Sequence, residues 1–355
     1  QYERTGNFDY PDGAYGVLSW WDYGHWITAK GERIPNANPF QQNVRPAAEF
    51  LLAQDESEGL DILEEEFQDS ETAKTQYVMI DALMVETEAR FGGKFFAPAD
   101  FHPDFERGDF YRRMTSEAGN TAIVNKQNYY ESMMVRLYHY HGSNTQPDPF
   151  VTQWVGQETR TSDGGAFVEM PQGENQSAVE FVDNISAARS MTENDPTSQV
   201  GGIGASPVEE VPALKQFRLV YDDRVPAVPF TGGEDGALTE ARNSGISTGP
   251  FATVANQNLP LMNSSLRQEA RGQKNELDTM FRTTPSFTKT FERVPGATIR
   301  GSLPDNASEH DVLNVSEGDT IGISVPMNMV HGEQFTYSQT VTLDENLEFN
   351  TTVPY

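Results

Sequence analysis

The chain has 355 residues, with 53 Asp or Glu against 25 Lys or Arg, and its formal net charge is −28. A surface this acidic repels nucleic acid and anionic membranes, so nucleic acid is not an expected partner. Only 7 of the 25 basic residues are Lys, and an acidic surface poor in Lys indicates adaptation to high salt. The 37% of hydrophobic residues suffice for a core, and the length predicts two or three domains.

Several classes of site are excluded by composition and motif. The chain has no Cys, which rules out disulfides and thiolate metal sites. It contains no Gly-rich phosphate loop, metalloprotease helix or Gly-x-Ser-x-Gly elbow, so hydrolase and nucleotide-binding functions have no site. No apolar run approaches the roughly 18 residues of a membrane-spanning helix, and the first residues show no signal-peptide pattern.

The first informative segment is Trp20–Gly24, which holds two of the four tryptophans of the chain, with a third two residues beyond it. An indole N–H only donates a hydrogen bond and a carboxylate only accepts, whereas a Ser or Thr hydroxyl does both. Trp20, Trp21 and Asp22 can therefore bracket one hydroxyl completely. The alternative is an aromatic corner that only packs, with Asp22 in a turn and Gly24 as a helix or turn terminator.

Helical patterns follow. Residues 44–66 carry apolar residues at helical intervals, with Gly59 as a break. The acid-rich stretch 55–71 predicts a solvated face rather than a cation site. Residues 70–90 predict one long helix, capped by Ser70.

The second half changes character. Residues 129–140 predict another amphipathic helix and residues 217–221 a strand. His139 and His141 end that helix, where they diverge, so isolated histidines are favoured over a metal pair. Residues 143–211 predict a β-rich insertion with short strands such as Ala166–Met170.

The C-terminal residues 295–355 alternate apolar and polar side chains, which predicts a small antiparallel β-sandwich or barrel. Residues 232–274 have few apolar runs and predict long irregular loops. Asn-x-Ser/Thr sequons, which are weak signals in Asn-rich sequence, occur at Asn175, Asn184, Asn263, Asn306, Asn314 and Asn350.

The letters of Trp20–Gly24 resemble the WWDYG signature of the AglB family, the archaeal members of the catalytic oligosaccharyltransferase subunits. Further segments are similar to haloarchaeal AglB in family order: Asn38–Gln41, Tyr77–Asp81, Tyr129–Met133, Arg136–Tyr138, Phe217–Tyr221, Phe291–Ala297 and Thr352–Tyr355. The resemblance implies that the acceptor Ser or Thr is bound by Trp20, Trp21, Asp22, Tyr23 and Gly24.

A second family motif, of the form Asp-x-x-Met or Asp-x-x-Lys, resembles Asp81-Ala82-Leu83-Met84. By this resemblance Asp81 and Met84 also belong to the acceptor pocket, on a kinked helix beside the WWDYG motif. Glu88 departs from the family pattern, where Lys or Ile stands, so its role is open. Read from periodicity alone, Met84 and its apolar neighbours form a core stripe.

The resemblance implies a dolichyl-phosphate-dependent transferase that moves an oligosaccharide to Asn of Asn-x-Ser/Thr sequons. The sugar-lipid site and the catalytic groups are expected in a membrane-embedded N-terminal region outside this chain, together with most ligands of a divalent Mn or Mg ion. No metal ligand or catalytic residue is assigned here, and we expect this portion alone to be inactive. The implied location is the extracytoplasmic face of the cell membrane.

The expected fold is a multidomain α+β protein with a mainly helical central core that carries the WWDYG motif. The expected parts are 1–142 (helical core), 143–211 (β-rich insertion), 212–294 (return to the core with a long loop) and 295–355 (peripheral β domain). An alternative function is a non-catalytic, acidic cell-surface or carbohydrate-binding protein, in which Trp20, Trp21 and Trp26 stack on sugar rings. That alternative requires exposed coplanar rings, whereas the first requires a small pocket beside Met84.

Overall fold

The structure is a computed structural model that describes residues 13–67, 74–87, 93–117, 119, 121–172, 177–223, 287–303 and 315–355. Its largest sheet has the strand order β11-β12-β3-β1-β2. The strands are β1 (Gly16–Leu18), β2 (Ile34–Pro35), β3 (Thr75–Asp81), β11 (Phe217–Asp222) and β12 (Thr288–Arg293). β1 is parallel to β2 and β3, whereas β12 is antiparallel to β3 and β11.

In the described residues 74–87, strand β3 and one helical turn stand where a long helix was predicted over residues 70–90, so that prediction is wrong. The segment Thr75–Asp81 is rich in β-branched and aromatic residues, which favour a strand. It lies between β1 and β12, and its residues Val78 and Ile80 are fully buried. Such a central strand loses the polar face that would reveal it in the sequence. Within residues 74–87 only the single turn α4 (Ala82–Val85) is helical.

Helices pack beside this sheet. They are α1 (Gly24–Ala29), α2 (Val44–Leu52), α3 (Glu56–Glu65), α5 (Phe96–Phe101), α6 (Arg107–Phe110), α7 (Gln127–Glu131) and α8 (Met133–Tyr140). The helix predicted over 44–66 is thus two helices. The break falls at Ala53 rather than at Gly59, because Asp55 caps α3 by accepting from the Glu58 amide. The helix predicted over 129–140 is likewise divided, by the extended backbone of Ser132.

The core is therefore mixed, and the expectation of a mainly helical core is corrected. Fully buried side chains of the central strands and of α2 and α8 form one cluster, which includes Phe50, Val78, Leu137, Phe217 and Phe291. Strands from three distant parts of the chain meet in this sheet. Their pairing is long-range, which local periodicity does not reveal.

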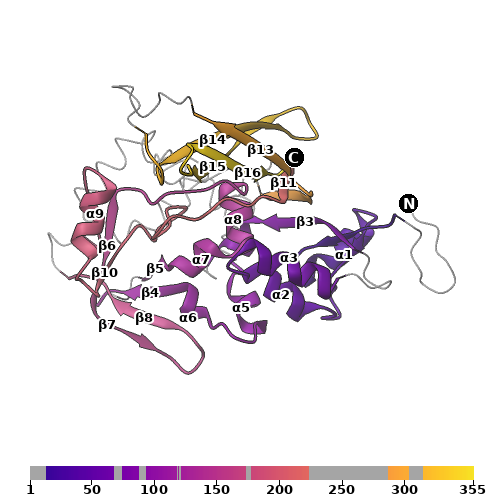
Figure 1. Ribbon diagram of the computed structural model, residues 1–355. Coiled ribbons are helices and arrows are strands. Elements are labelled where there is room, and N and C mark those ends of the chain that lie inside the picture. Colours follow the sequence, from indigo (N-terminus) through magenta and orange to yellow (C-terminus); the bar gives the residue numbers. More distant parts are fainter. Residues whose placement is uncertain are drawn as a thin grey trace, which may run out of the picture.

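Two smaller sheets lie on the other side of the molecule from α1 (Figure 1). One has the order β5-β4-β8-β7, with β4 (Tyr111–Thr115), β5 (Thr121–Asn125), β7 (Val155–Arg160) and β8 (Ala166–Glu169). The other has the order β10-β6-β9, with β6 (Phe150–Gln153), β9 (Val179–Phe181) and β10 (Ser198–Val200), and α9 (Ile185–Thr192) packs on it. The strand expected at Ala166–Met170 is confirmed. Because β4 pairs with β8, one sheet joins both sides of the boundary expected at 142, and the domain division stays a prediction.

The C-terminal strands form two antiparallel ribbons that lie together at the top of Figure 1. One pairs β13 (Ala297–Ser302) with β16 (Glu348–Val353), and the other pairs β14 (Thr320–Asn328) with β15 (Gln334–Thr342). The alternation predicted these strands, but in the described part of the chain they do not close into a barrel. The Tyr337 hydroxyl donates to the Leu214 carbonyl at 2.9 Å, which fixes the ribbons to the rest of the fold.

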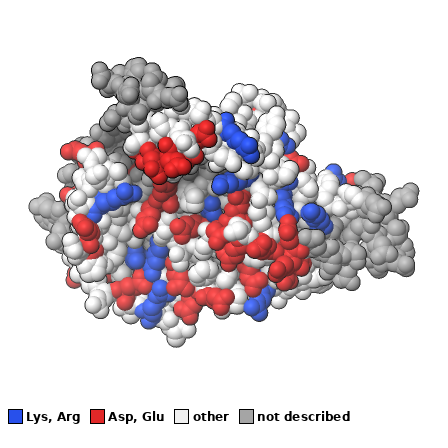
Figure 2. Space-filling view, viewed as in Figure 1, with Lys and Arg blue, Asp and Glu red and all other residues white. Residues whose placement is uncertain are grey.

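Acidic side chains are spread over the visible face of the molecule, with fewer basic ones between them (Figure 2). We expect the free energy of unfolding to rise from low to molar salt, because at −28 the surface repels itself unless counterions screen it. Thermal unfolding in NaCl from about 0.05 to 2 M, where the Debye length falls below roughly 3 Å, measures this. A matched series in sucrose, which is excluded from the protein surface but does not screen charge, separates charge screening from the general effect of an excluded solute. A melting temperature that does not change with NaCl would contradict the high-salt interpretation of the composition.

Candidate acceptor-hydroxyl site

The WWDYG segment and the Asp-x-x-Met segment meet at one edge of the central sheet. β1 and β3 are neighbouring parallel strands, with Leu18 opposite Val78, and each motif follows the carboxyl end of its strand. This edge of a sheet is where parallel topologies commonly place ligands. The structure thus brings together two segments that are about sixty residues apart in the sequence.

The WWDYG residues form the turn between β1 and α1. Trp20 precedes the 3-10 turn η1 (Trp21–Tyr23), and Gly24 is the first residue of α1 rather than a terminator. A Cβ at Gly24 would lie 2.8 Å from the Ala37 carbonyl oxygen, so close packing requires glycine here. Gly24 thus lets this turn approach the backbone that follows β2.

Trp20 and Trp21 differ in their surroundings. The Trp20 side chain is buried and its ring meets Phe101 edge-on at 5.8 Å between centroids, so it is part of the core. Trp21 is half-buried, and the planes of the two indoles are tilted by 58°. Trp26 is 63% exposed. The three rings do not make the exposed coplanar platform that stacking on sugar rings requires.

Two adjacent residues of the motif carry buried polar atoms without a partner in the described residues. They are the indole nitrogen Nε1 of Trp21, a donor, and the carboxylate oxygen Oδ1 of Asp22, an acceptor. Buried polar groups are nearly always hydrogen-bonded, so each atom without a partner requires an explanation. A hydroxyl, which both accepts and donates, is a group that can pair with either atom.

Asp81 and Met84 lie next to the turn formed by the WWDYG residues. The Asp81 carboxylate caps α4 by accepting from the Met84 amide at 2.9 Å, and the Ser19 hydroxyl contacts Met84 Sδ at 3.8 Å. Asp81 therefore fixes the position of Met84 relative to the end of β1. Met84 itself is almost fully buried.

Tyr23 connects Asp81 to the WWDYG turn. Burial raises the pKa of the Asp81 carboxyl above its usual range, and the Tyr23 hydroxyl and the Met84 amide partly oppose that shift. The pKa of the Tyr23 hydroxyl is also raised, first by burial and then by the charge of Asp81. Tyr23 hence keeps its proton at neutral pH and can direct it toward Asp81.

Lys94 also lies at this site, although neither apolar periodicity nor a sequence motif predicted it. Its Nζ donates to Asp22 Oδ2 at 2.6 Å and to the Tyr23 hydroxyl at 3.0 Å. The only signal in the sequence is the pair Gly92-Gly93 before a lysine in a chain that is poor in Lys. Glu88 lies outside the described residues, so its role stays a prediction.

His139 and His141 differ in backbone conformation. His139 lies in the last turn of α8, whereas His141 follows the helix with a left-handed φ of 54°, and its Nε2 lies 2.7 Å from the buried ammonium of Lys289. Tyr129 contacts His139 Nε2 at 3.4 Å. Among the residues that the structure describes, no group of three or more His, Cys, Asp or Glu side chains is arranged to hold a metal ion.

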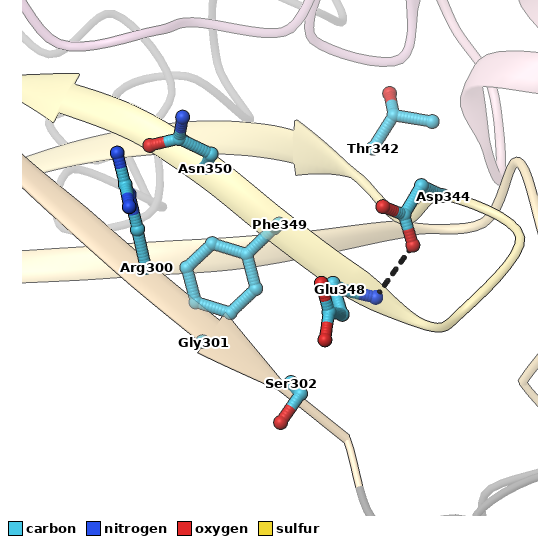
Figure 3. A pocket seen from close by; sticks show the side chains of 8 residues that line it. All are labelled: Arg300, Gly301, Ser302, Thr342, Asp344, Glu348, Phe349 and Asn350. Atoms are coloured by element: carbon cyan, nitrogen blue, oxygen red, sulfur yellow. Dashed lines mark hydrogen bonds between the residues drawn. The ribbon is translucent and has the colours of Figure 1, made fainter.

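A separate pocket of about 610 Å³ lies on β13 and β16, remote in sequence from both motifs (Figure 3). Its lining residues are Arg300, Gly301, Ser302, Thr342, Asp344, Glu348, Phe349 and Asn350. The Phe349 ring covers Gly301 on the neighbouring strand, where a Cβ would lie 2.5 Å from the ring, so it packs as part of the sheet. This pocket shares no residue with the acceptor-hydroxyl site.

Comparisons with known proteins agree with the motif. Residues 3–85 match the family model of the AglB core domain. Over 366 aligned residues the chain is 40% identical to the dolichyl-monophosphooligosaccharide–protein glycotransferase AglB of Haloferax volcanii, an alignment that covers 100% of this chain and 30% of that protein. The relatives are archaeal protein glycotransferases. The chain belongs to the AglB family, and it spans less than a third of the length of this relative.

Solved structures share the fold. A crystal structure of the Archaeoglobus fulgidus oligosaccharyltransferase, tethered to an acceptor peptide with an NVT sequon, has a TM-score of 0.50 at 21% identity and covers 98% of this chain and 34% of that one. The same enzyme in complex with Zn and sulfate has a TM-score of 0.49 at 20% identity and covers 98% and 36%. At this identity the likeness concerns the fold alone. In the described ranges no helix is long and apolar enough to cross a bilayer.

Proposed function

We propose that this chain is the acceptor-recognising portion of an archaeal oligosaccharyltransferase, which transfers a dolichyl-linked oligosaccharide to Asn of Asn-x-Ser/Thr sequons. The observation that carries the proposal is the adjacent pair of unpartnered buried atoms, Trp21 Nε1 and Asp22 Oδ1, in a chain 40% identical to AglB. Loss of transfer in an Asp22→Ala variant of the full-length enzyme is its test.

The chemistry of this portion is binding rather than bond cleavage. The hydroxyl two residues beyond the acceptor Asn donates to Asp22 Oδ1 and accepts from Trp21 Nε1. A site that hydrogen-bonds a hydroxyl rejects an analogue without it, because its own polar groups are then left buried and unpaired. Trp20 supports this pair from the core, and Tyr23, Gly24 and Asp81 position the turn.

The glycan-transferring step belongs to the membrane-embedded part of such an enzyme, at the extracytoplasmic face. A divalent metal, Mn or Mg, would act there, as the resemblance to the family implies. By the same resemblance, we assign activation of the Asn amide and cleavage of the sugar-lipid bond to that membrane-embedded part. The substrates are a polypeptide sequon and a lipid-linked oligosaccharide.

We expect Met84→Ala to narrow the preference for Thr over Ser sequons more than it lowers transfer to Ser sequons. Met84 makes no hydrogen bond to the proposed hydroxyl, so its contribution is apolar contact with the extra methyl of Thr, about 1 kcal/mol. Paired kinetics on peptides that differ only in Ser or Thr measure this. Met191→Ala is the matched control, since Met191 is exposed on α9. If the ratio of transfer rates to Thr and Ser peptides does not change, Met84 contributes only to core packing.

A further inference from the structure

Lys94 links the two halves of the acceptor site. Its ammonium contacts Asp22 Oδ2 at 2.6 Å and the Tyr23 hydroxyl at 3.0 Å, and it lies 4.5 Å from the centroid of the Tyr23 ring. Lys94 comes from neither motif and is 72 positions from Asp22 in the sequence. Both side chains of the ion pair are about one-third exposed (30% and 31%). Such a pair contributes little to stability, so its geometry calls for another role.

The backbone around Lys94 is fixed against α4. The Lys94 amide donates to the Leu83 carbonyl at 2.7 Å, and the next amide, of Phe95, donates to the Glu86 carbonyl. A Cβ on Gly93 would lie 2.3 Å from that same Glu86 oxygen, so only glycine allows this approach. The Phe95 ring is fully buried. The stem of Lys94 therefore starts from a fixed point beside Met84 and reaches across to the WWDYG turn.

This contact makes the two oxygens of Asp22 unequal. Oδ2 receives the ammonium, whereas Oδ1 is buried and has no partner in the described residues. Without the ammonium, no other hydrogen bond or ion pair to the Asp22 carboxylate among the described residues prevents it from rotating about its Cβ–Cγ bond. A charge-assisted hydrogen bond is directional and holds the group in one orientation.

We propose that Lys94 is a positioning residue for acceptor recognition, which holds Asp22 so that Oδ1 faces the acceptor hydroxyl. This inference rests on the proposed function. Lys94 does not itself touch the acceptor; it orients the group that does, and through Tyr23 it ties that orientation to the Asp81–Met84 segment. The opposite role, a lysine that occupies Asp22 and competes with the acceptor, predicts the opposite change in KM.

The test uses the full-length transferase with Lys94→Met, Lys94→Gln and Lys94→Arg variants, and Lys215→Met as an exposed control. Initial rates with lipid-linked oligosaccharide and Asn-x-Thr peptide give KM and kcat separately. We expect Lys94→Met and Lys94→Gln to raise the peptide KM roughly tenfold with a smaller change in kcat, because ground-state and transition-state binding of the hydroxyl weaken together. Lys94→Arg should recover most of the loss, and melting temperatures should stay close to the parent value.

The outcomes are distinguishable. Parent-like KM in both neutral variants, while Asp22→Ala abolishes transfer, would overturn the role of Lys94 and leave the proposed function standing. A lower peptide KM in the neutral variants would show that Lys94 competes with the acceptor, which also overturns it. If Asp22→Ala itself transfers normally, the proposed function fails first. Should Lys94→Met not fold, the comparison of Lys94→Gln, which removes the positive charge, with Lys94→Arg, which keeps it, decides the question.

Discussion

Asp22→Ala in the full-length enzyme is expected to lower transfer to sequon peptides by about 100-fold or more. Of Trp20, Trp21 and Asp22, only Asp22 can accept the hydroxyl proton, and its removal also takes from the Lys94 ammonium one of the two acceptors described for it. The loss should appear in kcat/KM for Ser and Thr peptides alike, because both carry the hydroxyl. Stability should change by less than about 1 kcal/mol, since the Asp22 ion pair is partly exposed (31%).

Further variants separate the loss of hydroxyl binding from general damage to the fold. Asp104→Ala removes an exposed carboxylate elsewhere and should leave transfer unchanged. Trp21→Phe keeps a ring but deletes the Nε1 donor, and we expect a loss of roughly 1–3 kcal/mol of acceptor binding. Undiminished transfer by Asp22→Ala would leave simple packing as the better account of residues 20–24.

The site was predictable from residue chemistry and family resemblance to different degrees. The donor and acceptor character of Trp21 and Asp22 is a property of the side chains, so the sequence indicates a hydroxyl partner before any fold is known. Their proximity to Asp81 depends on the parallel pairing of β1 with β3, which periodicity does not show. Lys94 could not be found in this way, because it reaches Asp22 only through the backbone contacts of Gly93 and Lys94 with α4.

The errors in fold prediction have one common origin. Between residues 74 and 85 the apolar side chains satisfy both a helical and an extended pattern, and only pairing with β1 and β12 decides for a strand. Likewise the alternation in the C-terminal residues correctly predicts strands β14 and β15, but sheet closure depends on long-range contacts. Strand existence is local information, whereas the arrangement of strands is not.

Lys289→Met is expected to remove most of the rise in stability that the parent chain shows between pH 7 and pH 10. Lys289 on β12 is fully buried, and its Nζ donates to the Tyr138 carbonyl at 2.7 Å beside the ring of Tyr138. Burial lowers the pKa of its ammonium from 10.5 to about 7. The neighbouring His141 has a pKa well below its usual value, mainly because of burial, and stays neutral as an acceptor.

The direction of this pH dependence follows from which state, folded or unfolded, binds the proton of Lys289. Between pH 7 and 10.5 the unfolded chain holds a proton on Lys289 that the folded chain has lost, so the free energy of unfolding rises with pH across that interval. Below pH 7 both states are protonated, and the folded state carries a constant penalty on the order of 3–5 kcal/mol. Lys126, whose pKa burial also lowers, adds a smaller change in the same direction. The Met variant keeps the apolar stem and loses the titrating group.

Denaturant unfolding at pH 7, 8, 9 and 9.8 in molar salt measures both curves, with the salt present so that the net charge does not dominate. Lys215→Met serves as the control, because Lys215 is exposed and its removal should leave the slope of the parent curve unchanged. We expect the Lys289→Met curve to be nearly flat and to lie above the parent at pH 7, where the parent still bears much of the cost of a buried charge. Equal slopes for parent and Lys289→Met would mean that the ammonium is fully compensated by Tyr138 and His141, and that it titrates near its ordinary pKa in the folded chain.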